Sequence, residues 1–251
     1  FHANRNFKRM LPWLGSSPVW CHQNLEWVAH RIKFDTHLHG IQKRLRMLEK
    51  YGVKPDGSQM EIFFNQSTQD TSQQILQTHG FKPKKYVYLN LGAAVERKRW
   101  MVERFSDLAR RILDTTPWHI VLGGGGEEDK KRAFTIMKQL NSTRVITDCS
   151  QPLRVSAAFI SEAGLMVTSD TGPMHIGFAV KTPIVALFGT MSPTLSGPYV
   201  IPDHLCKVIT IDPDGKNYDE ETNPEELHFR SITVDKVWEQ VEKMIQENSN
   251  L

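Results

Sequence analysis

The sequence contains little cysteine, no long apolar run and almost no excess of one charge, and each absence excludes a class of protein. Three cysteines, Cys21, Cys149 and Cys206, share no metal-ligand or redox spacing. This odd count without a disulfide framework indicates a reducing, cytoplasmic setting. No apolar run approaches the roughly 20 residues that a membrane-spanning helix needs. Lys and Arg number 31 against 28 Asp and Glu, a net charge of +3 that excludes nucleic-acid binding driven by bulk charge.

Residues 1–82 are the less regular part of the 251-residue chain. The sequence opens at Phe1 with neither Met nor the layout of a signal peptide, so we expect it to begin partway into a longer natural chain. Apolar residues recur on one face over 35–52, which predicts a helix, and a second short helix is predicted over 70–78. The basic run 82–85 is interpreted as a linker. Residues 1–82 are therefore interpreted as the remnant of one domain followed by a linker.

Short apolar strands alternate with amphipathic helices from residue 83 onward. Strands are predicted at 86–91, 119–122, 144–147, 165–169, 183–188 and 207–211, and helices at 101–113, 127–140, 152–161, 174–180 and 235–246. This alternation, with connections of a few residues, predicts an α/β fold with a parallel, doubly wound, Rossmann-like sheet. The second domain is therefore placed at 83–251.

Ligands of an open parallel sheet bind at the carboxyl ends of its strands, so the first two loops there are candidate sites. Loop 91–100 is either a solvated basic loop or a phosphate site in which Lys98 neutralises charge. The next loop opens at Gly123 with four glycines, but matches neither a dinucleotide nor a Walker motif. Its first acid, Glu127, either complements a helix dipole or accepts hydrogen bonds from ribose hydroxyls.

Two later loops also follow predicted strands. In segment 168–175, Asp170, Thr171 and Gly172 lead into a helix whose first amides would form an anion site. The alternative there is an ordinary helix cap. Segment 188–194 carries three hydroxyls, which favour either a polar turn or contact with phosphate or sugar.

Several patterns do not support a metal, hydrolase or nucleic-acid site. Asp212 and Asp214 have the Asp-x-Asp form of metal-dependent sugar transferases, but the proline and glycine beside them favour a turn. His37 and His39 fall at a predicted helix start and are too few for a metal site. The basic run 82–85 is too short, and without aromatic residues, for nucleic acid. No nucleophile elbow is present. We therefore expect no metal and no cofactor.

Two stretches of the sequence resemble glycosyltransferase family nine, the ADP-heptose:lipopolysaccharide heptosyltransferases. The first combines Asn90–Ala94 with Lys98–Trp100, and the second combines Ser169–His175 with Thr182–Gly189. The resemblance covers roughly residues 30–251. It implies a GT-B fold, in which two Rossmann-like domains face each other across a cleft, the C-terminal one binding the nucleotide sugar and the N-terminal one the acceptor.

The resemblance also implies roles for individual residues of a donor site within 83–251. Lys98 would lie on the diphosphate, and Asp170 at the sugar and phosphates, which makes both candidates for catalysis. Glu127 would meet the ribose and Gln151 would flank the adenine. The full set of implied donor-binding residues is Gly92, Ala93, Lys98, Gly123, Glu127, Gln151, Asp170, Thr171, Gly172 and His175.

The activity implied by the resemblance is transfer of heptose from ADP-heptose to a lipopolysaccharide inner-core acceptor by metal-independent inversion. Lys98 and the amides near Gly172 would stabilise the charge on the leaving diphosphate in place of a metal. The implied partners are a nucleotide-sugar donor and a lipid-linked oligosaccharide acceptor. The implied location is the cytoplasm, with peripheral contact at the cytoplasmic face of the inner membrane. The family's acceptor-side carboxylate base has no counterpart in this sequence, so no base is assigned.

Two alternatives stay open at this point. The chain is either a transferase that uses another nucleotide sugar, or a non-catalytic nucleotide-sugar-binding protein that lacks the acceptor half. Ala93 and Ala94 stand where some members of the family have hydroxyl residues near the phosphates. The resemblance therefore implies a donor site that is weaker than, or different from, that of those members.

Overall fold

The computed structural model describes residues 20–21, 30–31, 38–49, 52–189, 191–211, 229 and 231–249. The chain divides into two compact units, residues 1–58 and 59–251, which are described separately. In the first unit, β1 (Trp20–Cys21) pairs in parallel with β2 (His30–Arg31). Its helix α2 (Gly40–Glu49) lies within the predicted helix 35–52. Gly52, with a φ of 79°, follows it in the left-handed region that glycine adopts without strain.

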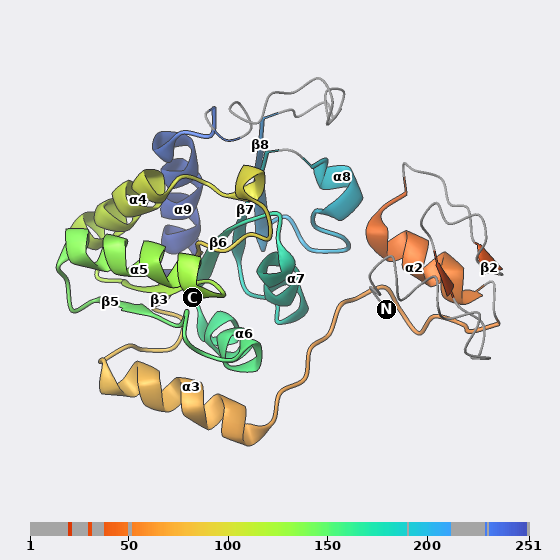
Figure 1. Ribbon diagram of the computed structural model, residues 1–251, viewed down its shortest axis with the longest axis horizontal. Coiled ribbons are helices and arrows are strands. Elements are labelled where there is room, and N and C mark those ends of the chain that lie inside the picture. Colours follow the sequence, from red (N-terminus) through yellow and green to blue (C-terminus); the bar gives the residue numbers. More distant parts are fainter. Residues whose placement is uncertain are drawn as a thin grey trace. The chain divides into compact units, whose positions relative to one another are not determined.

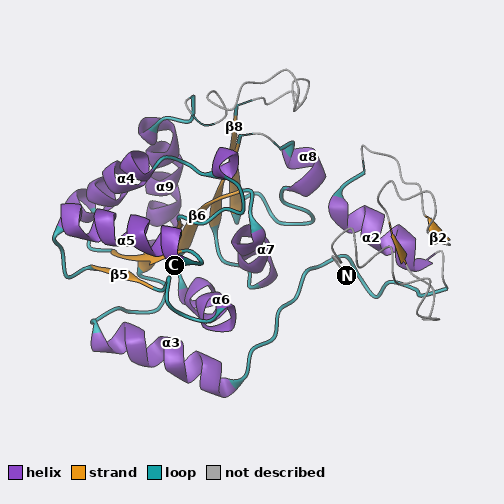
Figure 2. Cartoon of the chain, viewed as in Figure 1, coloured by secondary structure: helices purple, strands orange, loops and turns teal. Residues whose placement is uncertain are grey.

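The second unit is built on a six-stranded sheet in which every neighbouring pair of strands is parallel (Figures 1 and 2). Its strands are β3 (Tyr86–Asn90), β4 (His119–Gly123), β5 (Val145–Thr147), β6 (Leu165–Ser169), β7 (Ile184–Phe188) and β8 (Cys206–Thr210). Each predicted strand lies within one residue of an observed one at both ends. The predicted parallel α/β sheet is therefore confirmed.

The order of the strands is β5-β4-β3-β6-β7-β8, so the chain reverses direction across the sheet after β5. It builds outward from β3 to β5, returns to the other side of β3 as β6, and continues to β8. The crevice outside the carboxyl ends of β3 and β6 is then the topological switch point, where open α/β sheets bind their ligands.

Both faces of this sheet are covered by helices, which explains why its central strands are apolar on both sides (Figure 2). Alternate residues of β3 point to opposite faces. Val87 and Leu89 pack in one core with α4 (Val102–Thr115), α5 (Glu127–Leu140) and α9 (Val234–Ser249). Tyr86 and Tyr88 pack in the other core with α6 (Leu153–Glu162), α7 (Gly172–Ala179) and α3 (Gln66–Thr78).

Helix α3 begins earlier than predicted and belongs to the second unit. Asn65 caps it by accepting the amide of Thr68 at 3.0 Å. The polar first turns of the helix gave no apolar periodicity, which is why only 70–78 was predicted. Its buried Leu76 packs in a core of the sheet, and its Gln73 donates to Glu162 of α6 at 3.0 Å. The sequence-based boundary at 82/83 thus falls after α3, whereas the two units divide before it.

Two short helices were not predicted from the sequence. A 3₁₀ turn, η2 (Glu96–Lys98), lies in the loop after β3, and α8 (Pro193–Ser196) lies in the loop after β7. Such one-turn elements are too short to show a periodicity.

Candidate functional site

A pocket of about 380 Å³ opens at the switch point, over the carboxyl ends of the strands. Four loop regions contribute to it, namely those that follow β3, β4, β5 and β6. Its volume lies in the range typical of small-molecule sites. The residues that line it are Tyr88, Asn90, Gly92, Ala93, Ala94, Gly124, Gly125, Asp129, Gln151, Leu153, Ser156, Ile160, Thr171, Gly172 and Pro173.

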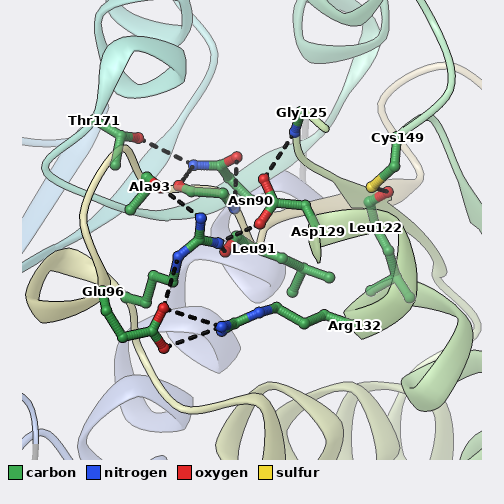
Figure 3. A network of polar contacts seen from close by, with 12 residues as sticks. Asn90, Leu91, Ala93, Glu96, Leu122, Gly125, Asp129, Arg132, Cys149 and Thr171 are labelled. Carbon is green, nitrogen blue, oxygen red and sulfur yellow. Dashed lines mark hydrogen bonds and ion pairs between the residues drawn. The ribbon is translucent and has the colours of Figure 1, made fainter. Parts of the chain in front are cut away.

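Asn90, the last residue of β3, joins the two strands that border the switch point. Its Nδ2 donates to Thr171 Oγ1 at 3.0 Å (Figure 3). It also lies within hydrogen-bonding distance of Thr168 Oγ1, at 3.0 Å, and of the carbonyl of Gly92, at 3.1 Å. Thr168 lies within β6, and Thr171 directly precedes α7. A single buried amide therefore ties the loop after β3 to the turn that starts α7.

Lys98 and Asp170 form an ion pair at the same edge of the sheet. Lys98 Nζ lies 2.8 Å from Asp170 Oδ2, and the two side chains are 25% and 8% exposed. Lys98 comes from η2 and Asp170 from the residue after β6, so parallel neighbouring strands bring them together. The cation and the carboxylate are 72 residues apart in the sequence.

The N-terminus of α7 faces this edge. Its N-cap residue is Thr171, which makes no side-chain cap hydrogen bond, whereas the alternative open from the sequence was an ordinary cap by Ser169 or Asp170. A Cβ added at Gly172 would meet no atom within 4 Å, so the backbone there borders open space. Free amides at a helix start carry partial positive charge and bind anions.

A second ion pair joins the loop after β3 to the loop after β4. Arg99 contacts the carboxylate of Asp129 and donates to the carbonyls of Leu91 and Ala93. The other oxygen of Asp129 accepts the amide of Gly125 at 2.9 Å (Figure 3). Since Asp129 is only 2% exposed, this pair holds both loops in place from beneath the pocket.

Glu96 extends this network at the surface. It pairs with Arg99 at 3.2 Å and with Arg132 of α5 through both carboxylate oxygens at 3.0 Å (Figure 3). Glu96 itself is 75% exposed, so solvent screens these outer contacts.

A buried carboxyl lies behind the pocket. The hydroxyl of Tyr88, which lines the pocket, donates to Asp148 Oδ2 at 2.9 Å. Burial raises the pKa of Asp148 to about 6, against the lowering effect of hydrogen bonds to its carboxylate. Burial and the nearby carboxylate of Asp148 also raise the pKa of Tyr88 well above its ordinary value. This wall of the pocket therefore becomes neutral as the pH falls below about 6.

The structure gathers most of the predicted donor-binding residues at one place. The predicted residues that line the pocket are Gly92, Ala93, Gln151, Thr171 and Gly172. Lys98 and Asp170 lie beside it as the ion pair described above.

The other three predicted residues, like Lys98 and Asp170, lie outside the pocket lining. Gly123 ends β4, and a Cβ there would overlap the ring and hydroxyl of buried Tyr88, so this glycine serves packing. Glu127 begins α5, is 80% exposed and lies 4.0 Å from Lys130. His175 lies one turn into α7, with its ring centroid 6.2 Å from that of Phe178.

Several residues of the pocket lining, notably Asn90, Asp129 and Tyr88, are not among the binding residues predicted from the sequence. A polar residue at the end of an otherwise apolar strand was the available signal for Asn90. For Asp129 the signal was an acid in the first turn after a glycine run. The two threonines that Asn90 contacts lie 78 and 81 positions further along the sequence. These contacts could therefore not be predicted without knowing the order of the strands.

The described ranges of the chain contain no candidate metal site and no candidate membrane span. Within those ranges no three His, Cys, Asp or Glu side chains are grouped so that they could hold a metal ion. His39 accepts the amide of Ile41 through Nδ1 at 3.1 Å at the start of α2. Asp212, Asp214 and His37 lie outside the described residues. None of the helices within the described ranges has the length and apolar character needed to cross a membrane.

Comparison with known proteins assigns the family. The model of glycosyltransferase family 9, the heptosyltransferases, matches residues 22–223. The chain belongs to glycosyltransferase family 9. The resemblance seen in the sequence is therefore confirmed.

Curated members of family 9 are similar to this chain at low identity. Lipopolysaccharide heptosyltransferase 2 of Escherichia coli is 29% identical over 119 residues, which is 45% of this chain and 32% of that protein. Lipooligosaccharide heptosyltransferase 2 of Campylobacter jejuni is 27% identical over 168 residues, 64% of this chain and 52% of that protein. The chain thus spans about half or less of the length of these relatives.

Solved structures of family 9 proteins share the fold. A family 9 glycosyl transferase from Veillonella parvula has a TM-score of 0.72 and 25% identity, over 88% of this chain and 64% of that one. The ADP-heptose lipopolysaccharide heptosyltransferase II of E. coli has a TM-score of 0.60 and 20% identity, over 79% of this chain and 57% of that one. The predicted GT-B-type fold is confirmed.

Proposed function

We propose that the pocket at the switch point is the donor site of a heptosyltransferase, which takes its sugar from ADP-heptose. The observation that carries the proposal is the meeting of Lys98, Asp170 and the open start of α7 at one edge of the sheet. A cation and free helix amides fit a diphosphate, and a carboxylate fits sugar hydroxyls. The names of the E. coli and C. jejuni relatives support heptose as the sugar.

The lining of the pocket fits a nucleotide whose base lies away from the phosphates. Gln151 and Leu153, at the start of α6, form one side, and Leu153 is 64% exposed. An exposed apolar side chain beside an amide suits the flat face and polar edge of a purine. Thr171 and Gly172 lie on the other side, where the diphosphate would meet the start of α7.

The proposed chemistry is transfer of the heptose to an inner-core hydroxyl of lipopolysaccharide, with inversion at the sugar carbon. As the sugar–phosphate bond breaks, negative charge grows on the leaving diphosphate. Lys98 and the amide of Gly172 would stabilise that charge, since preorganised donors act most strongly where charge develops. A base that activates the acceptor hydroxyl is not assigned to any described residue.

The partners and location follow from the same proposal. The acceptor would be a lipid-linked oligosaccharide, and the protein would meet it at the cytoplasmic face of the inner membrane. Donor binding would need no metal, because Lys98 and the α7 amides supply the positive charge. We expect EDTA to leave the affinity for ADP unchanged, and a strict requirement for magnesium would contradict this part of the proposal.

The proposal is tested by thermal unfolding of the chain with ADP, ADP-heptose, UDP and GDP. A ligand at about 100 times its dissociation constant adds roughly 2.7 kcal/mol to the free energy of unfolding. For a protein of this size that raises the midpoint by roughly 5–10 °C. We expect the rise with ADP and ADP-heptose alone. A rise with UDP or GDP instead would move the donor to another nucleotide sugar, and no rise at all would contradict a donor site.

A further inference from the structure

Asn90 is placed to control which way a neighbouring hydroxyl points. It is 1% exposed, ends β3 and lines the pocket. A side-chain amide nitrogen only donates, and its two hydrogens are shared among three acceptor oxygens. Its three acceptors are the carbonyl of Gly92 and the hydroxyls of Thr168 and Thr171.

The proton of Thr171 has only long bonds within this cluster, 3.2 Å to the carbonyl of Ser169 or, alternatively, 3.4 Å to the hydroxyl of Thr168. Thr168 donates to the carbonyl of Ser169 at 2.9 Å, while Thr171 reaches the same carbonyl at 3.2 Å. Because the bond from Thr171 is the longer and weaker of the two, Thr171 loses little when it turns its proton toward a ligand. Because Asn90 fills a lone pair of Thr171 at 3.0 Å, that hydroxyl favours donating to an incoming ligand over accepting from it.

We propose that Asn90 is a positioning residue of the donor site, which holds the Thr171 hydroxyl as a hydrogen-bond donor toward a phosphate oxygen of the diphosphate. This role rests on the donor function proposed above. It makes the turn before α7 selective for an acceptor oxygen, because three donors then converge there: the hydroxyl of Thr171, the amide of Gly172 and the ammonium of Lys98. Asn90 touches Thr171 and would act through it.

The test separates phosphate from nucleoside binding by calorimetric titration. ADP, inorganic pyrophosphate and adenosine are titrated into the wild type, Asn90→Ala, Thr171→Val and the double variant. We expect Asn90→Ala to lower the affinity for ADP and for pyrophosphate by about 10-fold, which corresponds to the loss of one good hydrogen bond. The affinity for adenosine should fall by less than about twofold. In the Thr171→Val background, Asn90→Ala should cost nothing further, because its route to the ligand is gone.

The controls deal with folding. Asn65→Ala, at the exposed cap of α3, removes the same amide group away from the pocket and should bind all three ligands as the wild type does. If Asn90→Ala does not fold, Asn90→Ser replaces it in the same cycle, since a hydroxyl leaves part of the polar cluster satisfied.

The possible results bear on the two proposals separately. An equal loss for adenosine and ADP, or a full additional loss in the Thr171→Val background, would overturn the positioning role. A wild type that binds pyrophosphate but not ADP, with Asn90→Ala weakening pyrophosphate, would overturn the adenine donor and keep the role of Asn90. If the wild type and Asn90→Ala bind ADP equally well, the donor site stands and the role of Asn90 is overturned. If the wild type binds none of the three ligands, both proposals are overturned.

Discussion

At the scale of single residues, the ion pair of Lys98 and Asp170 sets the charge of the pocket edge. The two groups lie 2.8 Å apart with Asp170 almost fully buried, so each neutralises the other. A diphosphate that approaches Lys98 has to share it with Asp170. The pair therefore keeps the ammonium group aimed at the edge of the pocket while limiting its attraction for any passing anion.

The first prediction concerns this lysine. We expect Lys98→Ala to weaken binding of ADP by about 10- to 100-fold, because a charge-assisted hydrogen bond to phosphate is lost and Asp170 is left unpaired beside it. Calorimetric titration measures the effect.

The matched control for Lys98 is Lys138→Ala, an exposed residue of α5. Lys84 is a poorer control, because its ammonium group donates to the carbonyls of Ser161 and Ala163 and its removal would disturb the fold. Equal effects of Lys98→Ala and Lys138→Ala would contradict the phosphate role of Lys98.

The second prediction concerns the buried Asp148 and pH. An unfolded aspartate has a pKa of about 4, and burial raises the pKa of Asp148 to about 6 in the folded chain. Its neutral form favours folding below pH 4, and this contribution is lost as the pH rises through 6. The free energy of unfolding should therefore fall by roughly 2–3 kcal/mol between pH 4 and 7 from this group.

Asp148→Asn isolates that contribution, since an amide does not titrate. We expect this variant to gain stability relative to the wild type as the pH rises from 4 to 7, as followed by urea unfolding at each pH. The free energy of unfolding of Asp203→Asn, a change at an exposed position, should depend on pH as that of the wild type does. A constant difference between Asp148→Asn and the wild type across this range would refute the raised pKa.

At the scale of elements, the glycines at the end of β4 and in the loop after it lie in different surroundings. Gly123 lies against the ring of Tyr88, which is buried and held by Asp148, whereas a Cβ at Gly125 would meet no atom within 4 Å. The run therefore combines one packing position with an open position at the pocket.

The third prediction follows from this difference. We expect Gly123→Ala to lower the free energy of unfolding by about 2 kcal/mol or more, because the added methyl group overlaps a ring that has no room to move. Gly125→Ala should change it by less than about 0.5 kcal/mol. Urea unfolding of both variants decides the matter, and equal losses would show that Tyr88 is free to shift.

The elements also show what the sequence could predict. Apolar runs and their spacing located the six strands of the sheet to within one residue, because strands buried on both faces carry continuous apolar sequence. The start of α3 was missed because its first turns are polar. The order of strands was not predicted, although the alternation predicted a parallel sheet, because alternation alone does not say on which side of β3 the chain places β6.

The limits of prediction at the site have the same cause. Lys98, Asp170 and Thr171 were selected because their loops follow strands and resemble a family motif. Asn90 and Asp129 act through contacts across the sheet, from Asn90 to Thr171 and from Asp129 to Arg99. These contacts depend on β3 lying between β4 and β6, which only the structure supplies.

At the scale of the whole molecule, the chain joins a parallel sheet that carries the switch-point pocket to a smaller first unit. It spans 32% and 52% of the length of the E. coli and C. jejuni relatives. The sheet unit alone holds the described residues that would bind the donor, since all of the pocket lining lies within residues 59–251. Donor binding is therefore a property that this chain can be tested for directly, whereas transfer depends also on an acceptor side.

The most direct test of the donor site is a crystal structure of the chain with ADP. We expect the diphosphate within hydrogen-bonding distance of Thr171, Gly172 and Lys98, and the base beside Gln151 and Leu153. We also expect the hydrogen bond from Asn90 to Thr171 to persist. ADP bound at another surface, or bound here with its phosphates turned away from the start of α7, would contradict it.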